Sequence, residues 1–189
     1  MKKVLLAASL SVMASGCVQG YIPPPNLPAS IQQVSTPMEA RRWLEETLTY
    51  KRDINLYHQS DYWASCGQTY KNRGGDCEDY AICAAALLRD NVEDGYIVEL
   101  YTPGKVEAHA IYVYQLHGRW GAISNQRMEY SQQKYLSIHE LMLRINTLPS
   151  GDKRYGRYNL RSYEGVDLLN HQGDLDNVLP KKGDYSLDH

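Results

Sequence analysis

Residues 74–89 read GGDCEDYAICAAALLR, and this stretch decides the fold of the chain. Acidic residues lie at its start, where the partial positive charge of a helix N-terminus stabilises them, and a nearly continuous apolar run follows. Such a run indicates a helix that is buried on most sides, and its four alanines permit close approach of neighbouring elements. We therefore predict a central helix from Asp76 to Arg89 that carries Cys77 in its first turn.

The elements around this helix follow from capping boxes and from apolar alternation. Apolar residues alternate with polar ones on both sides of two short turns, so we predict an antiparallel sheet of about three strands. The predicted fold class is α+β, with the helix that bears Cys77 packed on this sheet. In chain order the predicted elements are a helix from Thr36, a short helix or loop within 51–75, the central helix, strands at 96–101, 108–116 and 119–124, and a helix from Ser137.

The C-terminal part of the chain gives weaker signals. Helical and strand periodicity fade beyond Pro149, and the segment from Gly151 is rich in Tyr, Gly, Asp and Asn. We predict a single domain over residues 36–178 that ends in irregular structure, followed by disorder over residues 179–189.

Cys77 is the candidate reactive group. The unpaired N–H groups of a helix N-terminus favour a thiolate over a thiol, and the same groups can receive a developing oxyanion. Gly74 and Gly75 are expected to allow a sharp turn and to leave room for a substrate. The acidic neighbours of Cys77 oppose its ionisation, so a cationic group such as an imidazolium is needed beside the sulfur.

His109 is the candidate for that imidazole. It lies on the predicted strand 108–116, which can present a side chain to the N-terminus of a helix packed on the sheet. The next strand ends at Ser124 and Asn125, where it could lie alongside His109 and orient the ring through its second nitrogen.

Three stretches of this chain resemble the bacterial transglutaminase-like cysteine proteinases, which are exported papain-like thiol proteases related to the transglutaminase core. The stretches are GGDCEDYA at 74–81, DYWAS at 61–65 and EAHA at 107–110, and the resemblance spans roughly Trp63 to Asn125. It implies a papain-like transglutaminase-core domain with Cys77 as nucleophile and His109 as base. Some members of this family cleave large surface adhesins in the periplasm.

The resemblance also implies a metal site, and this chain departs from the family at one position of the catalytic triad. In some members a calcium ion near the catalytic cysteine is needed for activity, and the family's calcium-binding pair falls on Asp76 and Glu78 of this chain. The acidic position of the catalytic triad falls on Ser124, which is a poor substitute for a carboxylate. Asn125 could orient His109 instead, or the site could be weakened or inactive. No other cofactor is implied.

Simpler readings of the same residues stay open. Cys77 could be a small buried residue at a helix start, and His109 could be a strand histidine with a structural partner. Cys66 and Cys83 are expected to be inert or joined in a disulfide, because an exported compartment permits disulfides. Asp79 is expected to be a structural acid, and Trp63 a core residue.

The N-terminus is predicted to be a lipoprotein signal. Residues 1–16 combine Lys2 and Lys3 with an apolar run of about ten residues, which is too short to span a bilayer. Small residues then precede Cys17, an ending that resembles a bacterial lipobox, so we predict cleavage before Cys17 and its lipidation. An ordinary secretory signal is the alternative. Residues 17–35 contain four prolines and are expected to form a tether. By resemblance to enteric lipoproteins, Val18 after the cysteine implies the outer membrane.

These features define the expected function and its rivals. The formal net charge of −2 argues against nonspecific binding to nucleic acid, so the expected partners are a protein substrate in the cell envelope and the membrane that holds the lipid. We predict a lipoprotein of the outer membrane, facing the periplasm, that performs acyl transfer, most simply proteolysis or amide hydrolysis of an envelope or surface protein. A catalytically weak or inactive binding or scaffold lipoprotein is the alternative. An envelope redox protein, a third possibility, requires a disulfide at Cys77.

Overall fold

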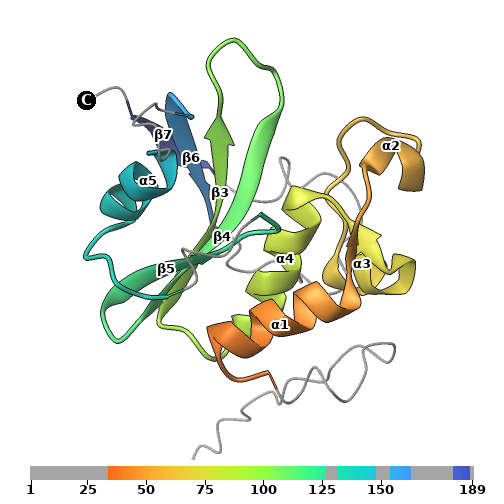
Figure 1. Cartoon of the computed structure of the whole chain (residues 1–189), viewed down its shortest axis with the longest axis horizontal. Coiled ribbons are helices and arrows are strands. Elements are labelled where there is room, and N and C mark those ends of the chain that lie inside the picture. Colours follow the sequence, from red (N-terminus) through yellow and green to blue (C-terminus); the bar gives the residue numbers. More distant parts are fainter. Residues whose placement is uncertain (1–33, 127–131, 148–153, 163–180, 188–189) are drawn as a thin grey trace, which may run out of the picture.

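Helix α4 (Cys77–Leu88) forms the centre of the structure, as its apolar run predicts. The structure, a computed structural model, describes residues 34–126, 132–147, 154–162 and 181–187. Every residue of α4 except Cys77 and Ala86 is buried. Asp76 is the N-cap, so the helix begins one residue after the predicted start. It lies along one face of a twisted sheet (Figure 1).

The three predicted strands are confirmed and lie in one sheet. The strand expected at 108–116 has those bounds, and the other two differ from their predicted bounds by two residues or fewer at one end. His117 and Gly118 join two of the strands with φ angles of 53° and 67°, the positive values that the favoured two-residue hairpin turns require. The strands are β3 (Asp94–Tyr101), β4 (Ala108–Leu116) and β5 (Arg119–Ile123).

The sheet has two further strands from the C-terminal part of the chain, where irregular structure and disorder were expected. Strand β6 (Arg157–Arg161) pairs with β3, and β7 (Lys181–Ser186) pairs with β6. The order is β5-β4-β3-β6-β7, and every neighbouring pair is antiparallel. Residues 181–186 lie within the segment 179–189 for which the sequence predicts disorder, and in this structure they form β7. Strand β6 forms because it pairs with the free edge of β3, and the local sequence of β6 does not predict this pairing.

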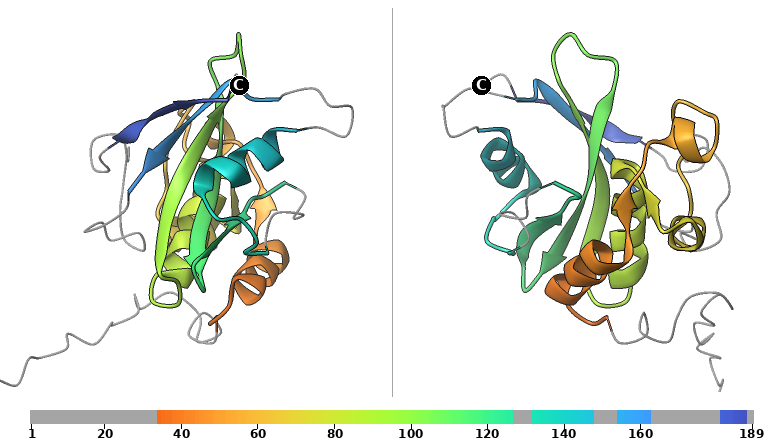
Figure 2. Two further views of the ribbon diagram at one scale, coloured as in Figure 1. Left: turned by 90° about the vertical axis from the view of Figure 1, so that its left-hand side faces the viewer. Right: turned by 45° about the vertical axis from the view of Figure 1, so that its right-hand side comes forward.

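Helices cover both faces of the sheet (Figure 2). Helix α1 (Pro37–Thr47) packs beside α4 on one face, and its predicted capping box is present, with Thr36 as N-cap. Helix α3 (Cys66–Asn72) also packs on α4. Helix α5 (Ile138–Asn146) lies on the opposite face and begins after Ser137, as predicted.

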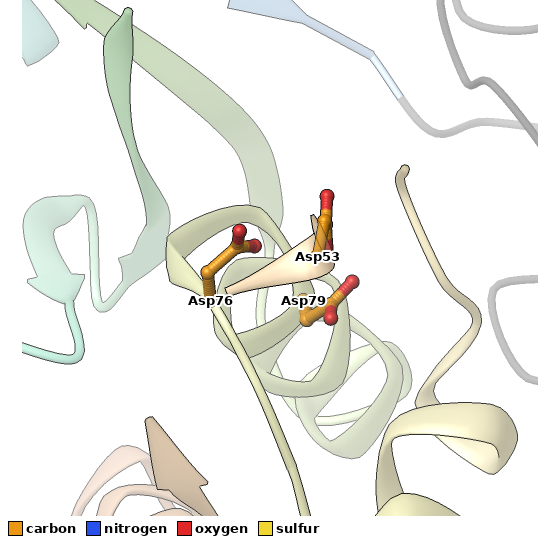
Figure 3. A group of neighbouring side chains, drawn as sticks. All are labelled: Asp53, Asp76 and Asp79. Carbon is orange, nitrogen blue, oxygen red and sulfur yellow. The ribbon is translucent and has the colours of Figure 1, made fainter. Parts of the chain in front are cut away.

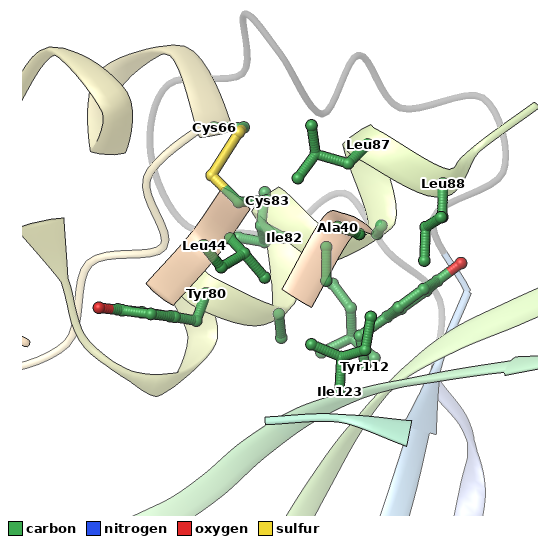
Figure 4. Packing of buried hydrophobic residues seen from close by; sticks show 14 of the residues in the cluster. Ala40, Leu44, Cys66, Tyr80, Ile82, Cys83, Leu87, Leu88, Tyr112 and Ile123 are labelled. Atoms are coloured by element: carbon green, nitrogen blue, oxygen red, sulfur yellow. A yellow bond between two sulfur atoms is a disulfide. The ribbon is translucent and has the colours of Figure 1, made fainter. Parts of the chain in front are cut away.

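Two buried clusters hold these layers together. Leu44 of α1, Ile82 of α4, and Tyr112 and Ile123 of the sheet belong to the first cluster (Figure 4). The second cluster lies under α5, where Leu141 packs with residues of the other sheet face. Because successive strand residues point to opposite faces, the alternation along β3 and β4 supplies both clusters. Within the described residues, no helix is long and apolar enough to cross a membrane.

The segment before α4 is held by a disulfide and by a short parallel bridge. Cys66 of α3 and Cys83 of α4 form a disulfide with a Cα–Cα distance of 4.5 Å, one of the two outcomes expected for this pair. Strand β1 (Thr49–Tyr50) pairs with β2 (Gly74–Gly75), and the short helix α2 (Asp53–Leu56) lies between them in the chain.

The two glycines serve close packing rather than a sharp turn. Neither has a positive φ angle. A Cβ atom on Gly75 would lie 2.2 Å from Asp79 Oδ2, and one on Gly74 would lie 2.2 Å from the carbonyl oxygen of Thr49. A larger residue at position 75 would displace the Asp79 side chain, and one at position 74 would push β2 away from β1.

Candidate active site

Cys77 occupies the first position of α4, with its thiol partly buried. The thiol donates a hydrogen bond to Glu78 Oε2 over 3.1 Å. Burial raises the pKa of the Cys77 thiol well above its usual range, and the negative charge of Glu78 raises it further, while a hydrogen bond from the Ala110 backbone acts in the opposite direction. In this arrangement Cys77 is a protonated thiol at neutral pH. Among the described cysteines it is the one outside a disulfide.

His109 lies near the start of β4, next in sequence to Ala110. Its Nε2 is 3.1 Å from Ser124 Oγ, and its ring stacks on Tyr155 with a centroid distance of 6.5 Å. Burial lowers the pKa of His109 to about 4, with a smaller contribution from the positive charge of Arg154. The imidazole is therefore neutral at pH 7.

The structure brings His109 to Ser124, but no hydrogen bond joins it to Cys77 among the residues the structure describes. The Ala110 backbone, which hydrogen-bonds the Cys77 sulfur, is one residue from His109. With Nε2 engaged by Ser124, Nδ1 is the nitrogen left for the thiol. Among the described residues no hydrogen bond joins Asn125 to His109, and Asn125 Oδ1 is buried with no hydrogen-bond partner.

Carboxylates gather around the N-terminus of α4. Ligand oxygens of Asp53, Asp76 and Asp79 lie within 4.8 Å of one another, and so do those of Asp53, Asp61 and Glu78. Figure 3 shows Asp53 reaching over the first turn of α4, from which Asp76 and Asp79 project. Asp53 is therefore shared by both groups.

These acids fit a hard divalent cation. Calcium takes six to eight oxygen ligands at about 2.3–2.6 Å, so oxygens within 4.8 Å of one another can face one ion. Asp53 Oδ1, Asp76 Oδ1 and Asp79 Oδ2 are buried and have no hydrogen-bond partner among the described residues. Burial is the main cause that raises the pKa of each of these carboxyls, and the charges of neighbouring acids contribute. A cation would relieve both costs.

The structure extends the predicted metal pair and explains Asp79. Asp76 and Glu78, the two acids expected to bind calcium, belong to the cluster, but Asp53 was not foreseen. No local pattern marks Asp53, because it lies 23 positions before Asp76 and reaches it only through the bridge of β1 with β2. Asp79 Oδ1 accepts a hydrogen bond from the Ala64 backbone N–H over 2.9 Å, the structural role expected for this acid.

Other predicted residues are found where expected or lie outside the described part. Trp63 is buried in the first core cluster, and the Arg161 guanidinium lies 4.9 Å from its ring centroid. The indole Nε1 of Trp63 donates to Asp61 Oδ1 over 3.0 Å. Cys17 and the predicted signal and tether up to residue 33 lie outside the described residues.

The fold and this site define the class of protein. The chain belongs to the transglutaminase-like domain family, which matches residues 27–148. The expected family and the expected α+β fold are therefore confirmed, although β6 and β7 lie beyond the matched region. A solved structure of EGTA-treated LapG from Legionella pneumophila is similar, with a TM-score of 0.46 and 15% identity over 79% of this chain and 78% of that chain. No curated protein matches this chain.

Proposed function

We propose that this protein is a cysteine-dependent acyl-transfer enzyme that hydrolyses a peptide or amide bond. The observation that carries the proposal is the placement of a free thiol at the N-terminus of α4, against the strand that bears His109. His109 is neutral and has Nε2 engaged by Ser124, which leaves Nδ1 to accept a proton.

The proposed reaction begins when the Cys77 side chain turns from Glu78 toward His109. His109 Nδ1 takes the thiol proton, and the sulfur attacks the carbonyl carbon of the substrate. Backbone N–H groups in the first turn of α4 have no helical acceptor and can hold the resulting oxyanion. The intermediate then expels the amine, which receives the proton from His109. Water cleaves the thioester that remains on Cys77, and an amine in place of water would give transamidation.

Calcium is the proposed cofactor of this chemistry, because the acidic cluster fits that ion. Asp53 would hold the ion either with Asp76 and Asp79 or with Asp61 and Glu78. A bound calcium ion would supply positive charge, which would offset the effect of the acidic neighbours that, after burial, raise the pKa of the Cys77 thiol. Release of the sulfur from Glu78 and transfer of its proton remain the work of the side chains at the site.

The proposed setting is the cell envelope. A lipidated Cys17, followed by a proline-rich tether, would hold the domain at the outer membrane and present the site to proteins in the periplasm. An envelope or surface protein is therefore the proposed substrate. Metabolic labelling with a radioactive or alkyne-tagged palmitate tests the anchor, because Cys17→Ser should abolish incorporation into this chain.

Alkylation of Cys77 tests the enzymatic proposal. Iodoacetamide labelling near neutral pH, read by intact mass in calcium and in chelator, should modify Cys77 in the calcium-loaded protein. His109→Ala should slow this labelling by at least about tenfold, because a positioned base contributes on the order of 10² to 10⁴ in rate. His139→Ala is the matched control, since His139 contacts Tyr158 on the other sheet face and not Ser124.

A binding or scaffold lipoprotein without catalysis is the second candidate. Two observations favour it: a hydroxyl rather than a carboxylate contacts His109, and the Cys77 thiol is engaged by Glu78. This candidate predicts slow labelling of Cys77 that His109→Ala leaves unchanged in calcium and in chelator. Such a result would overturn the enzymatic proposal.

A further inference from the structure

A pocket of about 210 Å³ lies between α1, α4 and the end of β5. Leu44 of α1 and its C-cap Leu48 supply one wall, and Ile123 at the end of β5 supplies another. Tyr80 of α4 also lines it. In the view of Figure 4, Leu44 lies between Tyr80 and Ile123, and the Tyr80 hydroxyl points away from Ile123.

The pocket adjoins the candidate catalytic residues on two sides. Ser124 lines the pocket, and its Oγ is also the atom that lies 3.1 Å from His109 Nε2. Tyr80 is three residues after Cys77 on α4, so the two side chains are neighbours on the same helix face. A substrate whose carbonyl reaches Cys77 can therefore place an adjacent side chain in this pocket.

The chemistry of the lining selects a kind of side chain. Leu44, Leu48 and Ile123 give the pocket an apolar part, which favours an aliphatic stem, beside the polar groups of the lining. Asn125 lines the pocket and holds a buried Oδ1 with no partner among the described residues, so a hydrogen-bond donor from the substrate would satisfy it. The two charged residues of the lining, Arg41 and Glu45, are paired with each other over 3.1 Å. A charged side chain would therefore meet no unneutralised partner.

We propose that this pocket is the specificity subsite of the enzyme and accepts a neutral side chain with an aliphatic stem and a terminal hydrogen-bond donor, such as glutamine. The inference rests on the proposed function, because it assumes that substrate reacts at Cys77. It makes Asn125 a residue that recognises substrate, and it assigns the Arg41–Glu45 pair the role of excluding charged side chains from the same place.

Electrophilic peptides test the subsite. The probes are dipeptidyl vinyl sulfones that carry glutamine, glutamate, lysine or norleucine, varied in turn at each of the two positions. The rate of Cys77 alkylation is read by intact mass in the calcium-loaded full chain and divided by the iodoacetamide rate of the same variant. At one position, glutamine should react at least about tenfold faster than glutamate or lysine, and about fivefold faster than norleucine, which lacks the donor.

Three variants locate the preference in the pocket. Asn125→Leu should bring the rates of glutamine and norleucine probes within about twofold of each other, because the acceptor is gone. Glu45→Gln should improve the glutamate probe relative to lysine by about threefold, and Arg41→Gln should do the reverse, as expected for partly exposed charges. Arg41 and Glu45 form one ion pair in the lining of the pocket, so opposite changes in the ratio of glutamate to lysine rates would locate the preference there.

The outcomes separate the two proposals. If Cys77 shows His109-dependent labelling but the probes react at equal rates, or their order does not respond to the three variants, the subsite inference is wrong and the proposed function stands. A preference for glutamate, lysine or norleucine also overturns it. If no His109-dependent labelling of Cys77 occurs, the proposed function fails and the subsite inference fails with it.

Discussion

Ser124 Oγ lies 3.1 Å from His109 Nε2, in the position where a carboxylate would balance the charge of an imidazolium. A hydroxyl can orient the ring, and the same Ser124 oxygen accepts a hydrogen bond from the Gln126 backbone N–H, which fixes its place. It adds no negative charge. The pKa of His109 consequently stays near 4, where burial and Arg154 hold it.

Ser124→Asp should therefore strengthen the base. A carboxylate within hydrogen-bond distance raises the pKa of a histidine, since it favours the charged imidazolium. We expect the pH profile of Cys77 alkylation to move upward by at least about one unit, with a rate near neutral pH about tenfold higher. Ser124→Ala should slow alkylation. The profile is measured with iodoacetamide and intact mass from pH 4 to pH 9.

A control separates this contact from a general effect of charge. Gln132→Glu adds the same charge at an exposed position that has no described contact with His109. It should leave the profile in place. If Ser124→Asp and Gln132→Glu behave alike, the Ser124–His109 contact has no part in tuning the base.

Calcium should stabilise the protein through the acidic cluster. At about a hundred times its Kd, a ligand that binds only the folded state adds about 3 kcal/mol, which in a chain of this size corresponds to a rise in Tm of about 5–10 °C. Asp53→Asn should remove most of this rise, because Asp53 belongs to both groups of oxygens. The same variant should raise the Tm in chelator, since one buried carboxylate is gone. Differential scanning calorimetry measures both effects.

Asp90→Asn serves as the matched control for the calcium prediction. Asp90 is exposed at the end of α4 and lies outside the cluster. Its loss should change neither the Tm in chelator nor the rise in calcium. Equal rises in wild type and Asp53→Asn would show that calcium, if it binds, does so elsewhere.

The pKa of His109 gives a stability prediction with a definite sign. The folded value of about 4 lies below the ordinary value of 6.5, so the unfolded chain binds the proton more tightly. His109 therefore costs nothing above about pH 6.5, and its penalty grows as the pH falls toward 4, where it levels off. From the two values the full penalty is about 3 kcal/mol. Raised carboxyl values such as that of Asp53, about 6, act in the opposite direction.

Comparison with a non-titrating variant isolates the His109 contribution. The free energy of unfolding of wild type minus that of His109→Gln, from urea titrations, should fall by about 3 kcal/mol between pH 7.5 and pH 4. The carboxyl contributions cancel in this difference. A flat difference over that range would mean that the His109 imidazole can protonate in the folded protein, against the burial that lowers its pKa.

How far the sequence predicts this structure depends on whether a signal is local. The Thr36 and Ser137 caps, the buried helix and the His117-Gly118 turn each depend on neighbouring residues, and all were predicted correctly. Strand β6 was missed because its identity comes from the edge of β3 on which it pairs. Asp53 was missed for the same reason, since only the path of the chain through β1 brings it to Asp76.

The features of the candidate site also differ in whether a local sequence signal predicts them. The first turn of α4 is a local motif, so the position of Cys77 followed from sequence. The contact of His109 with Ser124 depends on the register of β4 with β5, which the two-residue turn fixes, and it could therefore be anticipated. The engagement of the Cys77 thiol by Glu78 depends on side-chain rotamers, for which the sequence gives no signal.

The missed strand leads to a last prediction, because β6 carries a buried ion pair. Arg161 donates to both carboxylate oxygens of Glu99 on β3, over 2.8 and 3.0 Å, and Asn159 donates to the same carboxylate over 3.2 Å. Arg161→Leu would leave the Glu99 charge buried without its cation, which costs about 3–5 kcal/mol. Adding Glu99→Leu should recover much of that loss, since a paired apolar replacement leaves no charge behind. Urea unfolding of the two variants and of wild type measures both steps.

The exposed ion pair of Arg41 with Glu45 is the control that tests whether the cost of Arg161→Leu comes from burial. Arg41 and Glu45 are bonded over 3.1 Å, yet their side chains are 28% and 52% exposed. Water and salt screen such a pair, so Glu45→Ala should change the free energy of unfolding by less than about 1 kcal/mol. If Arg161→Leu cost no more than Glu45→Ala, β6 would contribute little to the fold, and the transglutaminase-like domain would be complete without the strands that follow residue 148.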